Sequence, residues 1–319
     1  MSKFAVKRWA KLLLFLLCLA LLGGMVWKAG PAQLWQTLCT LPLAILSSVI
    51  VWGVGYLINA ASFREVLAGV APQIAVPRFL DVFRLTVSGY AINYITPFGL
   101  LGGEPYRVLA LRKHYGSEGA TQGVVLYSMM HIASHFCFWL LSALVLVGMI
   151  WCRKIEGAMR LTEICSAMAL MLICLALLTL FWRLYRRGIM LRFMRRWVDW
   201  PLLNPSLLPP RRFRRALGWE LLSRLVNVIE YEIIMQALGF ASFGYIEALL
   251  VVAFSSLLAN ILFFSPLQMG TREGGIFLAL QYLLPGELLP VALTLSFATR
   301  IREFIWIAIG LLLSRRSAL

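Results

Sequence analysis

The chain has 319 residues, of which 61% are hydrophobic and only 14% are charged, and its mean hydropathy is +0.82. An ordinary soluble domain is excluded, because such domains are about half apolar and about a quarter charged. The composition predicts an all-α protein that crosses a membrane several times. The net charge of +16 lies in clusters beside apolar segments, which favours the cytoplasmic loops of a membrane protein over nucleic-acid binding.

Apolar segments predict three membrane crossings in the first half of the chain. They cover about residues 12–26, 42–63 and 120–150. The first could be read as a signal peptide, but it ends without a small-x-small cleavage site and is interpreted as a retained crossing. Its basic N-terminal tail is placed in the cytoplasm, because lysine and arginine collect on that side.

The apolar sequence between the second and third crossings is broken by Pro97. Residues 85–96 would form a helix of only about 18 Å, too short for a hydrocarbon core of about 30 Å. A second short apolar piece, residues 100–111, leads to Arg112 and Lys113. Because basic residues lie on both sides, the element is predicted to enter and leave by the cytoplasmic face, as a re-entrant helical hairpin.

The second half of the chain repeats this pattern in the opposite sense. A fourth crossing at about residues 162–182 leads to an arginine- and proline-rich linker, followed by crossings at 217–240 and 288–313. Between these two lies a second broken element, residues 245–283, which must begin and end outside. The predicted fold is therefore six transmembrane helices plus two re-entrant hairpins in an inverted-topology repeat, as in many alternating-access transporters.

One integral membrane domain is predicted, with four parts. Residues 1–41 hold the first crossing and an outer loop, and residues 42–151 form the first repeat. Residues 152–216 connect the halves, and residues 217–319 form the second repeat. Both termini are expected in the cytoplasm.

The two breaks carry the residues that are candidates for binding. Each has a proline followed seven residues later by a glutamate, with glycines and an arginine nearby, and a shift of 169 residues relates Pro97 to Pro266 and His131 to Arg300. Charge at bilayer depth costs several kcal/mol unless it is paired or hydrated, so it marks a pathway by default. The alternative is that buried glutamate–arginine pairs only hold the helices together. The candidate substrate-binding residues are Asn93, Thr96, Glu104, Arg107, His131, Ser265, Arg272, Glu273 and Arg300.

The chemistry of these residues favours an anionic lipid headgroup. After each break a half-helix begins with free backbone N–H groups and the positive end of its dipole. Arg272 and Arg300 add full positive charge, and guanidinium matches phosphate bidentately. Glu104 and Glu273 could neutralise an empty site, or bind a proton or cation that drives transport. Thr96 and Ser265 could donate hydroxyl groups or simply form turns.

The two broken stretches resemble the signature segments of the flippase-like family that forms the transmembrane region of lysylphosphatidylglycerol synthases. The segment Pro266-x-x-x-Gly270-x-Arg272-Glu273-Gly274 is the more specific, and Arg300 matches an arginine in the last span of that family. The resemblance implies movement of aminoacylated, glycosylated or other anionic lipids across the bacterial inner membrane. Where the family often has Glu-Arg, this chain has Met130-His131. No soluble aminoacyl-transferase domain follows the spans, so the chain is not expected to make lysyl-lipid.

The function predicted is therefore that of a lipid flippase rather than an enzyme. The alternatives left open are a membrane-embedded enzyme acting on lipid phosphates and a small-solute secondary transporter. No cofactor and no metal are expected, because His131 and His135 lie four residues apart without a carboxylate at ligand spacing. The expected partners are membrane lipids. The lipid, the direction, the energy source and the oligomeric state, with a dimer as one option, stay open.

Overall fold

The computed structural model describes residues 31–96, 102–151, 208–261, 271–286 and 288–315, with the isolated residues 27, 172–173, 175–176, 179–180 and 183. These parts of the chain are helical, which confirms the predicted all-α class. The predicted first crossing, most of the fourth crossing and most of the arginine-rich linker lie outside the described residues.

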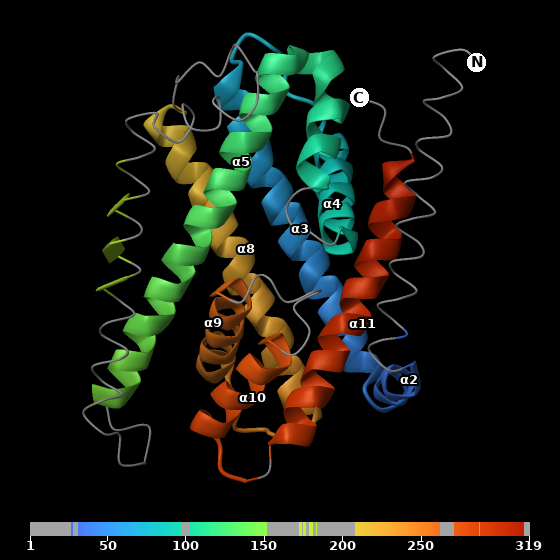
Figure 1. The fold of residues 1–319 in the computed structure, drawn as a ribbon, viewed down its shortest axis with the longest axis vertical. Helices are drawn as coiled ribbons and strands as arrows, with labels where there is room; N and C mark the ends of the chain where they lie inside the picture. Colours follow the sequence, from blue (N-terminus) through green and yellow to red (C-terminus); the bar gives the residue numbers. More distant parts are fainter. Residues whose placement is uncertain are drawn as a thin grey trace.

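The first half of the described chain is built around a long helix and a hairpin. Helix α2 (Pro31–Thr40) leads into α3 (Pro42–Val70), which runs the length of the molecule. Helix α4 (Phe79–Ile95) then runs back only to the middle, and α5 (Gly103–Trp151) returns to the same end before it turns (Figure 1). The turn lies at Gly116, whose φ of 71° and ψ of 174° are outside the helical region and favour glycine.

The second half has the same order of elements with the opposite direction. Helix α8 (Pro210–Ala237) runs the length of the molecule, and α9 (Tyr245–Ile261) and α10 (Thr271–Leu283) form a pair confined to the other half of that length (Figure 1). Helix α11 (Leu289–Ser314) then runs back along the whole bundle. Helix α4 and the part of α5 before Gly116 form a short pair, called the α4/α5 pair from here on. The short pairs α4/α5 and α9/α10 thus open toward opposite ends of the molecule.

Two apolar clusters hold these halves together. One is formed by side chains of α3, α4, α5 and α8 and includes Phe63, Leu85 and Tyr127. The other lies around α9 and α10 and includes Val251, Ile276 and Leu295. Helices α3 and α8 pack along each other, as do α4 and α11, so each short pair is packed against long helices from both halves.

Length and composition allow two of the described helices to cross a membrane. They are Pro42–Val70, with a mean hydropathy of 1.8, and Gly103–Met149, with a mean hydropathy of 2.0 over the most apolar stretch. Tyr245–Ile261 is apolar but shorter. Helices α8 and α11 have 28 and 26 residues, and their apolar sequence is interrupted by charged residues, several of which are paired with one another inside the bundle.

Candidate functional site

Asn93 joins the two helices of the first short pair. Its Oδ1 accepts a hydrogen bond from the Gly103 backbone N–H at 2.7 Å, and its Nδ2 donates to Glu104 Oε1 at 3.3 Å. The side chain therefore satisfies one of the four N–H groups that the start of α5 leaves without a helical partner. Thr96 Oγ1 donates to the Asn93 carbonyl at 3.2 Å, so this hydroxyl has a local role at the end of α4.

Arg107 is the cation at the centre of this pair, with only 1% of its surface exposed. Its Nη1 donates to Glu104 Oε1 at 3.1 Å and its Nη2 donates to the Thr86 carbonyl at 3.3 Å. The guanidinium carbon lies 4.8 Å from the centre of the Tyr90 ring and 5.3 Å from that of Tyr127. Acceptors and aromatic faces together stabilise a charge that burial alone would make costly.

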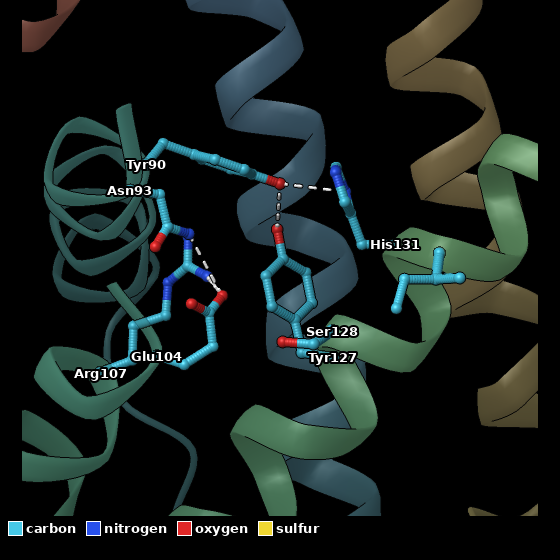
Figure 2. A pocket seen from close by; sticks show the side chains of 8 residues that line it. Tyr90, Asn93, Glu104, Arg107, Tyr127, Ser128 and His131 are labelled. Atoms are coloured by element: carbon cyan, nitrogen blue, oxygen red, sulfur yellow. Dashed lines mark hydrogen bonds and ion pairs between the residues drawn. The ribbon is translucent and has the colours of Figure 1, made fainter. Parts of the chain in front are cut away.

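A cavity of about 80 Å³ lies beside Arg107 (Figure 2). This volume has room for a few water molecules or one group of phosphate size. Within the described part of the chain, three buried polar atoms of the lining have no hydrogen-bond partner: Glu104 Oε2, Arg107 Nε and Ser128 Oγ. Each such atom costs about 1–3 kcal/mol if nothing satisfies it, which makes the cavity a place for a polar guest. The lining residues are Tyr90, Asn93, Glu104, Arg107, Tyr127, Ser128, His131 and Ile132.

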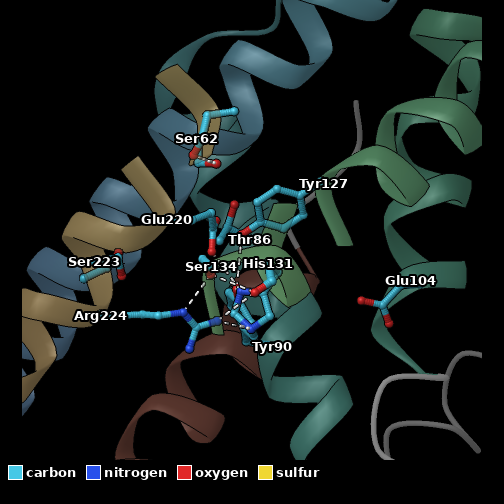
Figure 3. A network of polar contacts seen from close by, with 12 residues as sticks. Ser62, Thr86, Tyr90, Glu104, Tyr127, His131, Ser134, Glu220, Ser223 and Arg224 are labelled. Atoms are coloured by element: carbon cyan, nitrogen blue, oxygen red, sulfur yellow. Dashed lines mark hydrogen bonds and ion pairs between the residues drawn. The ribbon is translucent and has the colours of Figure 1, made fainter. Parts of the chain in front are cut away.

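A chain of polar contacts leads from the cavity to α8 (Figure 3). The Tyr90 hydroxyl lies 3.1 Å from the Tyr127 hydroxyl and 3.1 Å from His131 Nδ1. The same Nδ1 lies 2.8 Å from Glu220 Oε2, and Arg224 Nη2 donates to the His131 carbonyl at 2.9 Å. The cavity is therefore connected through Tyr90 and His131 to a buried acid, Glu220, and to a half-buried cation, Arg224, of the second half.

The second short pair presents its charges in ion pairs. Arg300 Nε and Nη2 both donate to Glu273 Oε1, at 3.0 and 2.7 Å, and Ser296 Oγ donates to the same oxygen at 2.9 Å. Arg272 forms an ion pair with Glu303. These contacts link the first turn of α10 to the middle of α11.

A third pair, Glu230 and Arg302, ties three helices together. Arg302 Nε and Nη2 donate to the two carboxylate oxygens at 2.9 and 3.0 Å, and both side chains are fully buried. Glu230 also accepts hydrogen bonds from Ser48 and Trp52. The Arg302 guanidinium carbon lies 3.7 Å from the centre of the Trp52 ring. The pair therefore holds α3, α8 and α11 in one register.

The candidate residues fall into two groups in space. Asn93, Glu104, Arg107 and His131 line the cavity, whereas Arg272, Glu273 and Arg300 lie in the ion pairs between α10 and α11. Ser265 lies outside the described residues. The candidates predicted from the sequence did not include several residues that complete the cavity and its polar network: Tyr90, Tyr127, Ser128, Glu220 and Arg224.

A sequence signal existed for part of this set. Glu220 and Arg224 stand four residues apart in an apolar stretch, a spacing that brings two side chains to one side of a helix. Nothing in the sequence singles out Tyr90 or Ser128. Within the described ranges, no three side chains of the metal-binding types gather closely enough to hold an ion.

Comparison with known families supplies the next observation. The family model described as the lysylphosphatidylglycerol synthase TM region matches residues 8–310. The chain belongs to this family. Membership makes it a protein of an integral-membrane family related to lipid handling, and it agrees with the resemblance seen in the two broken stretches. The search of curated proteins found no match.

Proposed function

We propose that this family member is a flippase that moves an anionic lipid across the bacterial inner membrane by alternating access. One observation carries the proposal: a buried arginine, Arg107, lies beside a cavity at the point where a helix pair turns back in the middle of the bundle. Guanidinium pairs with phosphate through two parallel hydrogen bonds. The buried atoms without partners around it supply further donors and acceptors for a headgroup.

The arrangement that we propose in the membrane is six crossings and two re-entrant hairpins, and the described helices support it. The short pairs α4/α5 and α9/α10 would enter from opposite faces, an inverted repeat of the kind found in many alternating-access transporters. Their helix ends would then lie near the bilayer midplane, where irregular backbone is tolerated only inside protein or beside a water-filled cavity.

Charge supports the orientation in which α4 and α5 open to the cytoplasm. The described basic residues outside the interior lie mainly at the end of the bundle toward which α4 and α5 open. The described loops at the other end, 238–244 and 284–286, contain neither lysine nor arginine. Under the positive-inside rule this end faces the cytoplasm. The basic residues at this end include Arg64, Arg78, Arg112, Lys113, Arg211, Arg214, Arg215 and Arg315.

The proposed binding step is an exchange of partners at Arg107. A lipid phosphate entering the cavity would compete with Glu104 for the guanidinium, and Glu104 would turn toward water or toward a donor of the headgroup. The ion pairs of α10 and α11 would exchange partners in the same manner when the other face opens. No bond is made or broken in this cycle, so transport rather than an enzymatic reaction is proposed.

A liposome assay tests the proposal. Purified protein is reconstituted with fluorescent phosphatidylglycerol or phosphatidylcholine, and a membrane-impermeant quencher reports the lipid in each leaflet. We expect faster exchange of the anionic lipid, and at least a tenfold loss in Arg107→Gln. The matched control is Arg84→Gln, which removes the same charge from the partly exposed Arg84–Asp81 pair of α4. Equal rates for both lipids, or equal rates for both variants, would count against the proposal.

A further inference from the structure

Glu220 is a buried acid next to the cavity with half of its hydrogen-bonding capacity unused. Its side chain is 1% exposed, and its Oε2 lies 2.8 Å from His131 Nδ1. Its other oxygen, Oε1, is buried and has no hydrogen-bond partner among the residues that the structure describes. A buried carboxylate oxygen without a donor is unfavourable as a charged acceptor, but the same atom can carry a proton.

Arg224 fixes the state of the histidine between them. Its Nη2 lies 3.4 Å from His131 Nε2, and its Nε donates to Ser134 Oγ at 2.7 Å. Because guanidinium only donates hydrogen bonds, the facing Nε2 must be the acceptor of the ring, and this network assigns the ring proton to Nδ1. Nδ1 then donates to Glu220. The three groups together carry one positive and one negative charge, so the set is neutral.

The other titratable groups near this set come from three helices. On α4, Tyr90 contacts His131, and on α3, Tyr56 packs its ring 5.4 Å from that of Tyr90. On α5, the neighbours are Tyr127, His135 and Arg107. Figure 3 shows Tyr90, Tyr127, His131, Glu220 and Arg224 gathered between α4, α5 and α8. The described carboxylates next to His131 and to the cavity are therefore Glu220 and Glu104.

We propose that Glu220 binds a proton, and that this proton and an anionic headgroup in the cavity strengthen each other's binding. This proposal rests on the proposed lipid transport and adds its coupling ion. Water reaches Glu220 along His131, because 24% of the histidine side chain is exposed whereas Glu220 is enclosed. A hydronium ion gives its proton to Glu220 Oε1 and leaves as water. His131 keeps its proton on Nδ1 and its hydrogen bond to Oε2, so the imidazole is neutral before and after, and the carboxylate becomes a neutral acid.

The coupling follows from charge at close range. Protonation of Glu220 leaves Arg224 without its compensating negative charge. The cavity then has Arg107 in its lining and Arg224 behind His131, with Glu104 as the acid in contact. In the interior the effective dielectric constant is low, so this change favours an anion in the cavity far more than it would in water. Linkage requires the converse, that the anion favours the proton by the same factor. A lipid and a proton would therefore cross in the same direction.

The test measures binding of a soluble short-chain phosphatidylglycerol to the purified full chain in detergent at pH 7.5 and pH 5.5. We expect affinity at least about fivefold tighter at the lower pH, the lower end of typical coupling. Glu220→Gln imitates the protonated acid and should bind tightly at both values. The matched control, Glu232→Gln, makes the same change on α8 at a side chain that contacts Gln236 in an exposed position, and should retain the wild-type pH dependence.

A second measurement needs no variant. When the lipid is added to wild-type protein in weak buffer at pH 6.5, a pH-indicator dye should report net proton uptake upon binding. Lipid binding with no pH dependence and no proton uptake would overturn the coupling and leave the proposed function intact. A Glu220→Gln variant whose lipid binding has the wild-type pH dependence would have the same two consequences. Absence of lipid binding at every pH would overturn both.

Discussion

The buried pair of Glu230 and Arg302 permits a quantitative prediction about stability. Both side chains are fully buried, and Glu230 accepts two hydrogen bonds from Arg302 in addition to those from Ser48 and Trp52. Glu230→Leu would leave a buried guanidinium without its acceptors. Glu303 cannot replace them, since its oxygen is 3.7 Å from Arg302 Nη1 and already pairs with Arg272. Breaking one side of a buried pair costs about 3–5 kcal/mol, which is the expected loss in free energy of unfolding.

The double variant Glu230→Leu/Arg302→Met separates the pair from simple loss of packing. Two apolar side chains of similar volume often replace a buried ion pair with little loss, so we expect a favourable coupling energy of about 1–3 kcal/mol between the substitutions. Recovery is incomplete because the Ser48 and Trp52 donors still lose their acceptor. The assay is reversible denaturation in mixed detergent micelles, followed by far-ultraviolet circular dichroism.

The matched control is Glu65→Leu, which removes the partner of Arg212 from a pair that is 22% and 39% exposed. Partly exposed pairs contribute about 0–1 kcal/mol, so this variant should change stability little. If Glu230→Leu cost no more than Glu65→Leu, or if the two substitutions at the buried pair were additive, the reasoning that this pair joins α3, α8 and α11 would be refuted.

Three further predictions follow from packing and charge. In Gly89→Ala the new methyl group would lie 2.7 Å from the Arg107 guanidinium carbon. The arginine must then move by about 1 Å to reach a normal contact of about 3.5 Å, so lipid exchange should fall at least tenfold. The control Gly218→Ala, with open space around the added methyl group, should leave lipid exchange unchanged. In Glu273→Gln, Arg300 loses a charged acceptor, and thermal unfolding should show a loss of about 1.5–3 kcal/mol. In Gly310→Val, the first added carbon would lie 2.8 Å from the Val87 carbonyl oxygen, so α11 must move from α4 at a cost of about 1–3 kcal/mol, measurable in the same assay. Wild-type behaviour of any of the three would contradict the packing described for that position.

The sequence predicted the helix breaks because proline, length and charge act locally. The expected end of the first short segment, just before Pro97, agrees with an α4 that ends at Ile95. The outer boundaries differ more: α3 continues to Val70, and α8 begins at Pro210. Hydropathy locates the apolar part of a helix, whereas the helix itself continues through polar residues such as Glu65, whose backbone hydrogen bonds do not depend on the membrane.

The partners of the charged residues could not be predicted, because they depend on how helices face one another. The sequence placed Arg272 and Glu273 side by side, yet α10 directs them to different partners on α11, Glu303 and Arg300. Glu220 reaches His131 across 89 positions of sequence. Helical periodicity indicates which side of a helix is polar, but the neighbour it meets is determined by the packing of the whole bundle.

The most direct test of the account is a structure of the protein in lipid nanodiscs that contain phosphatidylglycerol. The account predicts a phosphate group in the cavity, within about 3 Å of the Arg107 guanidinium as in other charge-assisted hydrogen bonds, and density for the α4/α5 pair entering the bilayer from one face only. A bilayer-spanning α4, or anionic lipid bound solely at the periphery while the cavity holds only water, would contradict it.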